Sequence, residues 1–349
     1  MSDIDLCDRL RRALQAARSP WVDAALQPMA DKGLAHHHVR LLGSGAIARL
    51  PKQSQMGLDA QATLDYQAAC FERAGASGAT PRLMGRLPPS DALPRGGLLV
   101  QEIVGRSARL PQDLPAIAIA LAAIHALPLP APAHRTPLRH DADPLQALRD
   151  EIDTQANHLD GAGLDAPSRA RIEAQRAKLQ QCCEAAARPL RRLIAFDAHP
   201  GNFVVQDDGR AVLVDLEKAR YSFCALDLAH ATLYTSTTWD VDVRAELTLD
   251  EIAGTYDTWA AHTDAAAIER AWWLPLRAAM WLWSVTWCAK WRALSARSAR
   301  TDALGEDWSQ HLSDAALVAH VRNRVECYLS AAVIERVVEE FAALQRRWR

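Results

Sequence analysis

Two acids and an asparagine constrain the fold of this chain most strongly. Asp197 and Asn202 stand at the two ends of the run Asp-Ala-His-Pro-Gly-Asn, and Asp215 directly follows the apolar segment 211–214. The Pro-Gly pair inside the run predicts a sharp turn, and the apolar segment 203–205 predicts a strand that pairs with 211–214 in a hairpin. We therefore expect the three polar side chains to lie side by side at the open end of this hairpin.

The order of these three side chains suits the division of labour in phosphoryl transfer from a nucleotide. An acid on a tight loop can accept the proton of a substrate hydroxyl, while an asparagine and a second acid hold a magnesium ion against the phosphates of ATP. An acidic hairpin without a catalytic role is the alternative, because one acid and one asparagine at this spacing often occur by chance. Three elements in order, each in a matching loop or strand, favour the catalytic interpretation.

The segment 194–231 resembles the catalytic core of the aminoglycoside phosphotransferase and choline kinase superfamily, whose fold is protein-kinase-like. The family pattern H-G-D-x-H-P-x-N, I-D-[WF]-E and D-L-A is matched here by Asp197, His199, Pro200, Asn202, Asp215, Glu217 and Asp227-Leu228-Ala229. The resemblance implies that Asp197 is the catalytic base and that Asn202 and Asp215 are the magnesium ligands. It also implies that Asp227 is a buried acid that braces the catalytic loop.

The same resemblance implies an α+β, protein-kinase-like architecture of two lobes. A small, abbreviated N-lobe with an antiparallel sheet is expected next to a large, mainly helical C-lobe. We expect residues 1–35 to form an N-terminal helical extension, 36–104 the nucleotide-binding N-lobe, and 105–349 the helical C-lobe with the catalytic loop and the acceptor site. A length of 349 residues is long for one hydrophobic core and agrees with two lobes.

A glycine turn and a single lysine are the candidate phosphate-binding features of the predicted N-lobe. The turn Gly43-Ser44-Gly45 joins two strand-like segments, and in a kinase-like fold such a turn lets backbone N–H groups approach phosphates. Lys52 is the only lysine between residues 36 and 104, so it is the candidate for the ammonium that orients ATP. It follows the turn more closely along the chain than the family arrangement implies, and Arg49 is the alternative cation.

The segment 97–103 resembles the strand that leads into the hinge between the two lobes. Backbone groups of Gln101, Glu102 and Ile103 are therefore expected to contact the adenine ring. Together with the catalytic core, these features imply ATP as the phosphoryl donor and Mg²⁺ as its metal.

Three positions depart from the family pattern. Gln67 stands where the family's helix supplies a glutamate to pair with the lysine, and Asp65 and Glu72 are nearby acids of the same predicted helix. Ala195 and Phe196 replace the family's His and Gly before the catalytic acid. These departures support an alternative function, a nucleotide-binding pseudokinase with a regulatory or scaffolding role. A binding protein that uses the cleft without ATP is a third alternative.

For the tryptophan and histidine clusters, we favour a structural role over a role in binding a substrate or a metal. Trp283, Trp287 and Trp291 share one face of a predicted helix and are expected to pack in the core, with a wall of the acceptor site as the alternative. The run 36–38 is three histidines, which are expected at the surface. Successive side chains of a strand point to opposite faces and cannot converge on one metal.

Composition and charge exclude several classes of partner. A net charge of −2 offers no basis for binding nucleic acid, which usually requires a basic excess. The sequence holds no apolar run of about eighteen residues, so we expect no membrane span. Seven cysteines without zinc-type spacing, and a start without a signal peptide, predict reduced thiols and a cytoplasmic location.

The sequence therefore predicts an enzyme, a small-molecule kinase that depends on ATP and Mg²⁺. Its acceptor is expected to be a hydroxyl of an aminoglycoside-, choline- or sugar-like molecule. The residues indicate neither which acceptor is used nor an oligomeric state.

Overall fold

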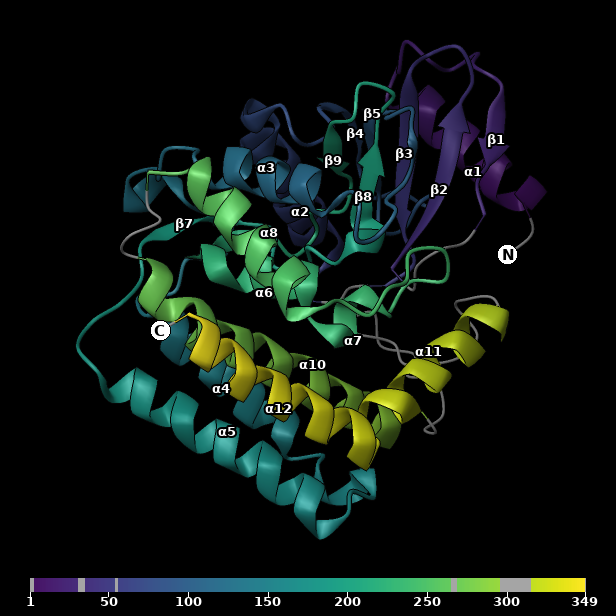
Figure 1. The fold of residues 1–349 in the computed structure, drawn as a ribbon. Coiled ribbons are helices and arrows are strands. Elements are labelled where there is room, and N and C mark those ends of the chain that lie inside the picture. Colours follow the sequence, from purple (N-terminus) through teal and green to yellow (C-terminus); the bar gives the residue numbers. More distant parts are fainter. Residues whose placement is uncertain (1–2, 31–34, 54–55, 265–268, 296–314, 349) are drawn as a thin grey trace.

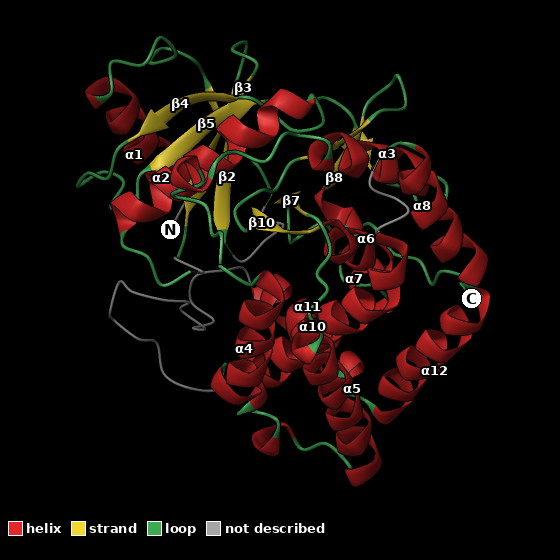
Figure 2. Ribbon diagram, turned by 90° about the vertical axis from the view of Figure 1, so that its left-hand side faces the viewer, coloured by secondary structure: helices red, strands yellow, loops and turns green. Residues whose placement is uncertain are grey.

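The chain forms two lobes of different make-up (Figure 1). The computed structural model describes residues 3–30, 35–53, 56–264, 269–295 and 315–348. The larger antiparallel sheet belongs to the N-terminal lobe, and the long helices belong to the C-terminal lobe, as a side view also shows (Figure 2). The predicted combination of a small sheet lobe and a large helical lobe is confirmed.

Five antiparallel strands form the sheet of the small lobe, in the order β1-β2-β3-β5-β4. Their bounds are β1 (Leu26–Pro28), β2 (His36–Leu41), β3 (Ala46–Pro51), β4 (Leu83–Leu87) and β5 (Gly97–Gln101). The sheet thus begins before residue 36, where we expected the N-lobe to start. Strand β1 has only three residues, which is too short to show an alternating pattern in the sequence.

Two helices cover opposite faces of this sheet. Helix α1 (Asp3–Ala16) buries Leu6, Leu10 and Leu14 against residues of β2, β3 and β5. Helix α2 (Ala60–Ala74) packs on the other face, in a cluster that includes Leu98 and Val100 of β5. Alternate residues of a strand point to opposite faces, so each central strand contributes to both layers.

The large lobe is built mainly from helices, whose bounds are α3 (Leu114–His125), α4 (Pro144–Ala156), α5 (Ala166–Glu184), α6 (Cys224–Thr232), α7 (Tyr234–Thr237), α8 (Leu249–Ala261), α10 (Trp273–Leu294), α11 (Ala315–Tyr328) and α12 (Ala331–Arg347). Short 3₁₀ turns are η1 (Gly75–Ser77), η2 (Pro132–His134), η3 (Asp160–Ala162), η4 (Pro200–Asn202) and η5 (Arg270–Trp272). Two small antiparallel sheets carry the catalytic segment, with strands β6 (Arg106–Ser107), β7 (Arg191–Ile194), β8 (Phe203–Val205), β9 (Ala211–Leu213) and β10 (Arg220–Phe223).

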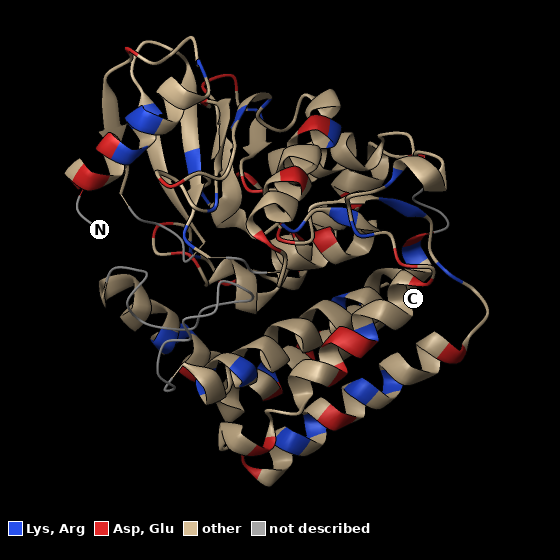
Figure 3. Ribbon diagram, turned by 180° about the vertical axis from the view of Figure 1, so that it is seen from behind, with Lys and Arg blue, Asp and Glu red and all other residues tan. Residues whose placement is uncertain are grey.

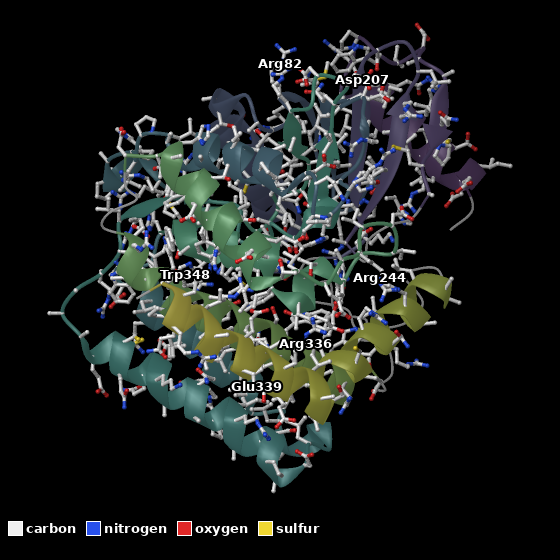
Figure 4. All side chains as sticks on the ribbon, viewed as in Figure 1. Arg82, Asp207, Arg244, Arg336, Glu339 and Trp348 are labelled. Atoms are coloured by element: carbon white, nitrogen blue, oxygen red, sulfur yellow. The ribbon has the colours of Figure 1, made fainter. Side chains whose placement is uncertain are left out.

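Helix α10 is the central helix of the large lobe and packs against α4, α5 and α6. Of the three tryptophans that we expected in the core, Trp291 is buried, whereas Trp283 and Trp287 are only partly buried and pack against it. At the C-terminal end of α12, Trp348 packs against Tyr256 and Trp273 (Figure 4). The last helix is thereby fixed to the core through aromatic contacts.

Charges of both signs are mixed along the outer helix α5 (Figure 3). Glu173 accepts hydrogen bonds from Arg169 and Arg176 on the same helix, and Arg176 also pairs with Asp153 of α4. Within the ranges that the structure describes, we find no helix that is both long and apolar enough to cross a membrane.

Replacing Leu10 tests whether α1 is part of the small lobe. Leu10 has no exposed surface, so Leu10→Ala should lower the free energy of unfolding by about 2–5 kcal/mol, measured by urea denaturation. Ile4 lies on the same helix with 76% of its surface exposed, and Ile4→Ala should change that free energy by less than about 0.5 kcal/mol. Equal effects of the two substitutions would contradict the packing of α1 on the sheet.

Candidate active site

The structure brings Asp197, Asn202 and Asp215 together, as the hairpin pattern predicts. Asn202 lies at the end of the turn η4, and its side-chain Nδ2 donates to the main-chain oxygen of Asp197 at 2.8 Å. The backbone N–H of Val214 donates to the main-chain oxygen of Asn202 at 2.9 Å, which places Asp215 beside the catalytic loop. With Nδ2 held by Asp197, the side-chain oxygen of Asn202 is the atom that can face a cation.

Asp227 braces the catalytic loop from below, and this prediction is confirmed. Its carboxylate, which is fully buried at the start of α6, accepts hydrogen bonds from the N–H groups of Ala195 and Phe196 at 2.7 and 2.8 Å. The imidazole of His125 lies 3.1 Å from the same carboxylate and accepts a hydrogen bond from the indole of Trp259. The brace acts on main-chain groups, which Ala195 and Phe196 supply in place of the family's His and Gly.

Phe196 holds a backbone conformation that is unusual for a residue with a side chain. Its φ of 63° lies in the left-handed region, which costs about 1–2 kcal/mol for an L-residue other than glycine. Packing of the ring offsets this cost, since the Arg220 guanidinium lies 3.6 Å from its centroid and Trp283 meets it edge-on at 5.2 Å. The strain therefore lies at the residue directly before Asp197, and strained residues often have a functional role.

Gly201 has no side chain because another loop occupies that space. A Cβ atom at this position would lie 2.5 Å from Oδ2 of Asp240. The other carboxylate oxygen of Asp240 accepts hydrogen bonds from the N–H groups of Asp242 and Val243, which holds that loop against the catalytic loop. The glycine of the Pro-Gly pair is thus required by packing as well as by the turn.

Asp197 forms an ion pair that the sequence did not indicate. The ammonium of Lys218 donates to its Oδ2 at 2.7 Å, and His230 Nδ1 lies 3.7 Å from its Oδ1. Burial disfavours ionisation of Asp197, but the charge of Lys218 outweighs it and the pKa of the carboxyl lies below its usual value. Lys218 belongs to no part of the family pattern quoted above, so no sequence signal singled it out.

The cation that reaches Asp215 is Arg49, the alternative that we kept open for this role. Its Nη2 lies 2.7 Å from Oδ1 of Asp215, and its Nη1 donates to the main-chain oxygen of Val214 at 3.1 Å. Burial raises the pKa of Asp215, but the guanidinium of Arg49 outweighs this effect and keeps that pKa below its ordinary value. Lys52 follows the end of β3, is buried, and donates its backbone N–H to Ala35.

The turn Gly43-Ser44-Gly45 lies away from Asp215, at the other end of the β2–β3 hairpin. Its neighbour is Glu102, whose N–H donates to the main-chain oxygen of Gly45 at 2.7 Å. From Gly45 to Arg49 the strand rises by about 13 Å. The structure thus places this turn beside the segment expected to form the hinge, at the opposite end of the hairpin from Arg49. A hairpin pattern does not reveal which of its two ends faces the cleft.

His36 corrects our expectation that the three histidines lie at the surface. It is buried on β2, with Nδ1 3.3 Å from Oε2 of Glu217 and Nε2 3.2 Å from Oε1 of Gln67. Burial and the charge of Asp215 raise the pKa of Glu217 to about 8, and burial and the charge of Arg49 lower the pKa of His36 to about 3. Near neutral pH the three groups thus form an uncharged chain, in which the Glu217 carboxyl donates to His36 and His36 donates to Gln67.

The side chain by which helix α2 contacts His36 is therefore Gln67, which is neutral, and not an acid. Asp65 and Glu72 point outward, where both pair with Arg86 at 3.2 and 2.7 Å. The structure thus agrees with the departure from the family pattern at position 67. A neutral chain of hydrogen bonds through His36 connects α2 with the strands, where the family pattern implies an ion pair.

The oxygen donors at Asn202 and Asp215 fit the chemistry of Mg²⁺. This ion prefers oxygen ligands, and in nucleotide sites it takes one or two protein carboxylates and completes its shell with phosphates and water. Asp215 stays ionised and keeps a quarter of its side chain exposed. Within the described ranges no group of three or more His, Cys, Asp or Glu residues could hold a metal, so a metal bound without phosphates has no ready site there.

Comparison with known proteins agrees with this geometry. The model of the phosphotransferase enzyme family matches residues 39–264. No curated protein matches the chain.

Solved structures share the fold. They include a choline/ethanolamine kinase family protein from Mesorhizobium loti, with 15% identity, a TM-score of 0.58, and coverage of 96% of this chain and 99% of that one. An aminoglycoside phosphotransferase from Alicyclobacillus acidocaldarius has 17% identity, a TM-score of 0.56, and coverage of 96% of both chains. A spectinomycin phosphotransferase in complex with ADP and spectinomycin has 12% identity, a TM-score of 0.57, and coverage of 93% and 94%. At these identities the likeness shows the fold, which is the predicted protein-kinase-like one.

The raised pKa of Glu217 can be tested through the pH dependence of the free energy of unfolding. A carboxyl whose pKa is about 8 in the folded chain and 4.5 in the unfolded chain stabilises the fold less as pH rises between these values. The lowered pKa of His36 acts in the opposite direction below 6.5, and burial raises the pKa of Glu269 to about 7, so the Glu217 effect is clearest between about 7 and 8. Glu217→Gln should flatten the fall in unfolding free energy across this interval, by at most about 1.4 kcal/mol per pH unit, in urea denaturation at several pH values.

The control for this experiment is Glu173→Gln, which removes a partly exposed carboxylate of α5. That variant should keep the wild-type pH profile in the same interval. A Glu217→Gln profile parallel to that of the wild type would show that Glu217 is ionised in the folded chain.

Proposed function

Because the chain belongs to the phosphotransferase enzyme family, we propose that this small-molecule kinase transfers the γ-phosphoryl group of ATP to a hydroxyl of its acceptor. The observation that carries the proposal is the joint placement of Asp197, Asn202 and Asp215, tied by two hydrogen bonds and braced by Asp227. The expected acceptor remains an aminoglycoside-, choline- or sugar-like alcohol.

In the proposed reaction the acceptor oxygen forms a bond to the γ-phosphorus. The bond between that phosphorus and the oxygen that bridges to the β-phosphate breaks, and its electron pair stays on ADP. The hydroxyl proton goes to a carboxylate oxygen of Asp197. The low pKa of this carboxylate makes it a weak base, which suits a loose transition state in which orientation of the hydroxyl matters more than its early deprotonation.

Positive charge is needed on the nucleotide side of the reacting phosphorus. We assign this role to Arg49, which already contacts Asp215, in place of the Lys52 that the sequence favoured. Mg²⁺ held by Asn202 and Asp215 would neutralise charge on the phosphates.

The proposed adenine contacts fall on the main chain after β5. In the described part of the chain, the N–H groups of Gln101 and Glu102 donate to the main-chain oxygens of Arg82 and Gly45. The N–H that we expect to meet adenine is therefore that of Ile103. We retain the division into a nucleotide-binding N-lobe up to residue 104 and a C-lobe with the acceptor site beyond it, and we move the start of the N-lobe to β1.

A nucleotide-binding pseudokinase is the second candidate, and one observation favours it. The contact between α2 and the cleft is the neutral chain of Gln67, His36 and Glu217, so the ion pair that usually marks an active kinase is replaced. The two candidates differ in one measurement, acceptor-dependent release of ADP across a panel of alcohols, sugars and aminoglycosides.

Asp197→Asn tests the proposed reaction. The amide cannot accept the hydroxyl proton, so acceptor-dependent ADP release should fall by about 100-fold or more. Binding of Mg-ATP, measured by calorimetry, should change by no more than a few-fold. Asp208→Asn, in the exposed turn between β8 and β9, is the matched control and should keep full activity. Normal turnover of Asp197→Asn would refute the assignment, and absence of turnover in the wild type with intact Mg-ATP binding would favour the pseudokinase.

The same substitution at Arg49 and at Lys52 shows which of the two cations binds the phosphates. Arg49→Met removes charged hydrogen bonds, each of which contributes about 1.5–3 kcal/mol, so Mg-ATP binding should weaken by at least about tenfold. Lys52→Met should weaken it less. Calorimetry of both variants decides the assignment, and a larger loss for Lys52→Met would return the phosphate-binding role to the lysine.

A further inference from the structure

Lys218 is a partly buried lysine beside Asp197, and the proposed reaction does not yet assign it a role. It follows Asp215 by three residues, and its side chain is 20% exposed. Its Nζ lies 2.7 Å from Asp197 Oδ2 and 5.7 Å from the ring centroid of Trp283. The nearby carboxyl groups come from two segments, the catalytic loop with Asp197 and the segment with Asp215 and Glu217.

The protein does not use every donor of this ammonium. Partial burial disfavours the charged form, but Asp197 and the other nearby acids outweigh this effect, and the pKa of Lys218 lies above its ordinary value. An ammonium has three donors, and in the part of the chain that the structure describes one of them is engaged, by Asp197. Two donors are therefore left for oxygens that are not part of the protein.

The position of Lys218 relative to the reaction identifies those oxygens. The acceptor hydroxyl must lie within hydrogen-bond distance of Asp197, and its oxygen must come within about 3–3.5 Å of the γ-phosphorus before attack. A cation on the same carboxylate therefore borders the attacked phosphoryl group. Arg49 pairs with Asp215 and Lys218 pairs with Asp197, so the two cations would reach the phosphoryl group from different acids.

We propose that Lys218 is a catalytic residue that contacts the transferred γ-phosphoryl group from the acceptor side, in addition to orienting Asp197. This inference rests on the proposed function. Arg49 would hold the phosphates of the nucleotide in both the ground state and the transition state. Lys218 would act on the oxygens of the phosphoryl group as it leaves ADP, where a fixed charge in a water-poor site is most effective. Loss of Lys218 should therefore lower kcat and leave nucleotide affinity nearly unchanged.

The surroundings of Lys218 hold its ammonium in place. The indole Nε1 of Trp283 donates to Oε1 of Glu151 at 2.6 Å, and Glu151 also pairs with Arg139 at 2.6 Å and with Arg220 at 3.3 Å. This network fixes the aromatic face near which the ammonium lies. Trp283 thus lies beside Lys218, while Trp291 packs in the core.

The test compares Lys218→Met with the wild type in steady-state kinetics and calorimetry. With the acceptor that gives the fastest ADP release in the panel, kcat should fall by about 100-fold, as for loss of one preorganised charge at the transition state. The Kd for Mg-ATP should stay within about threefold of the wild-type value. Lys178→Met, at an exposed position of α5, is the matched control and should leave both quantities unchanged.

Two further variants separate catalysis from a structural role. Lys218→Arg keeps the charge and should retain part of the lost kcat. Lys218→Ala should be rescued by ethylammonium with saturation, while the wild type gains nothing from it. An unchanged kcat in Lys218→Met would overturn the inference. A joint loss of Mg-ATP binding and of folding in Lys218→Met and Lys218→Arg would also overturn it, in favour of a structural ion pair.

The outcome for Lys218 is distinguishable from the outcome for the proposed function. If the wild type turns over and Asp197→Asn does not, the phosphotransferase assignment holds, whatever Lys218→Met shows. If Asp197→Asn turns over normally, the proposed function fails first, and the inference for Lys218 fails with it.

Discussion

The catalytic loop depends on one buried carboxylate. Asp227 accepts hydrogen bonds from two successive main-chain N–H groups, and these bonds hold Phe196 in a left-handed conformation that its side chain alone would not favour. That conformation sets the direction in which the chain enters Asp197. Since a buried charged acceptor without its donors would cost several kcal/mol, the brace and the loop stabilise each other, and α6 cannot move without moving the catalytic acid.

Two ion pairs and one neutral chain set the electrostatics of the site. Asp197 pairs with Lys218, Asp215 pairs with Arg49, and Glu217 shares a proton-bearing contact with His36. Three carboxyl groups so close together would repel one another if all were ionised. Asp197 and Asp215, which pair with cations, stay ionised, whereas Glu217, which faces His36, is protonated near neutral pH. This division leaves negative charge on Asp197 and Asp215, the acids that we propose to bind a hydroxyl and a metal.

The sequence predicted the residues on the C-lobe hairpin better than those that the N-terminal lobe brings to the site, for a physical reason. Asp197, Asn202 and Asp215 lie on a short hairpin, so their spacing along the chain nearly determines their spacing in space. Arg49 and His36 meet these acids only through the packing of one lobe on the other, which no local pattern encodes. Lys218 is close in sequence to Asp215, but its direction depends on the turn that follows the strand, and its role became visible only from its contact with Asp197.

The paired acids also bear on how a nucleotide enters the site. Each carboxylate has a cation in place and a lowered pKa, so neither must be ordered or deprotonated when a nucleotide arrives. Phosphate oxygens would instead share Arg49 and Lys218 with the acids that now hold them. Such an exchange keeps the fixed charges at their positions and avoids reorganisation at the moment of transfer, which is the condition under which electrostatic stabilisation is strongest. The missing ion pair at Gln67 is then less costly, because the cation at the phosphates is positioned by Asp215 and not by helix α2.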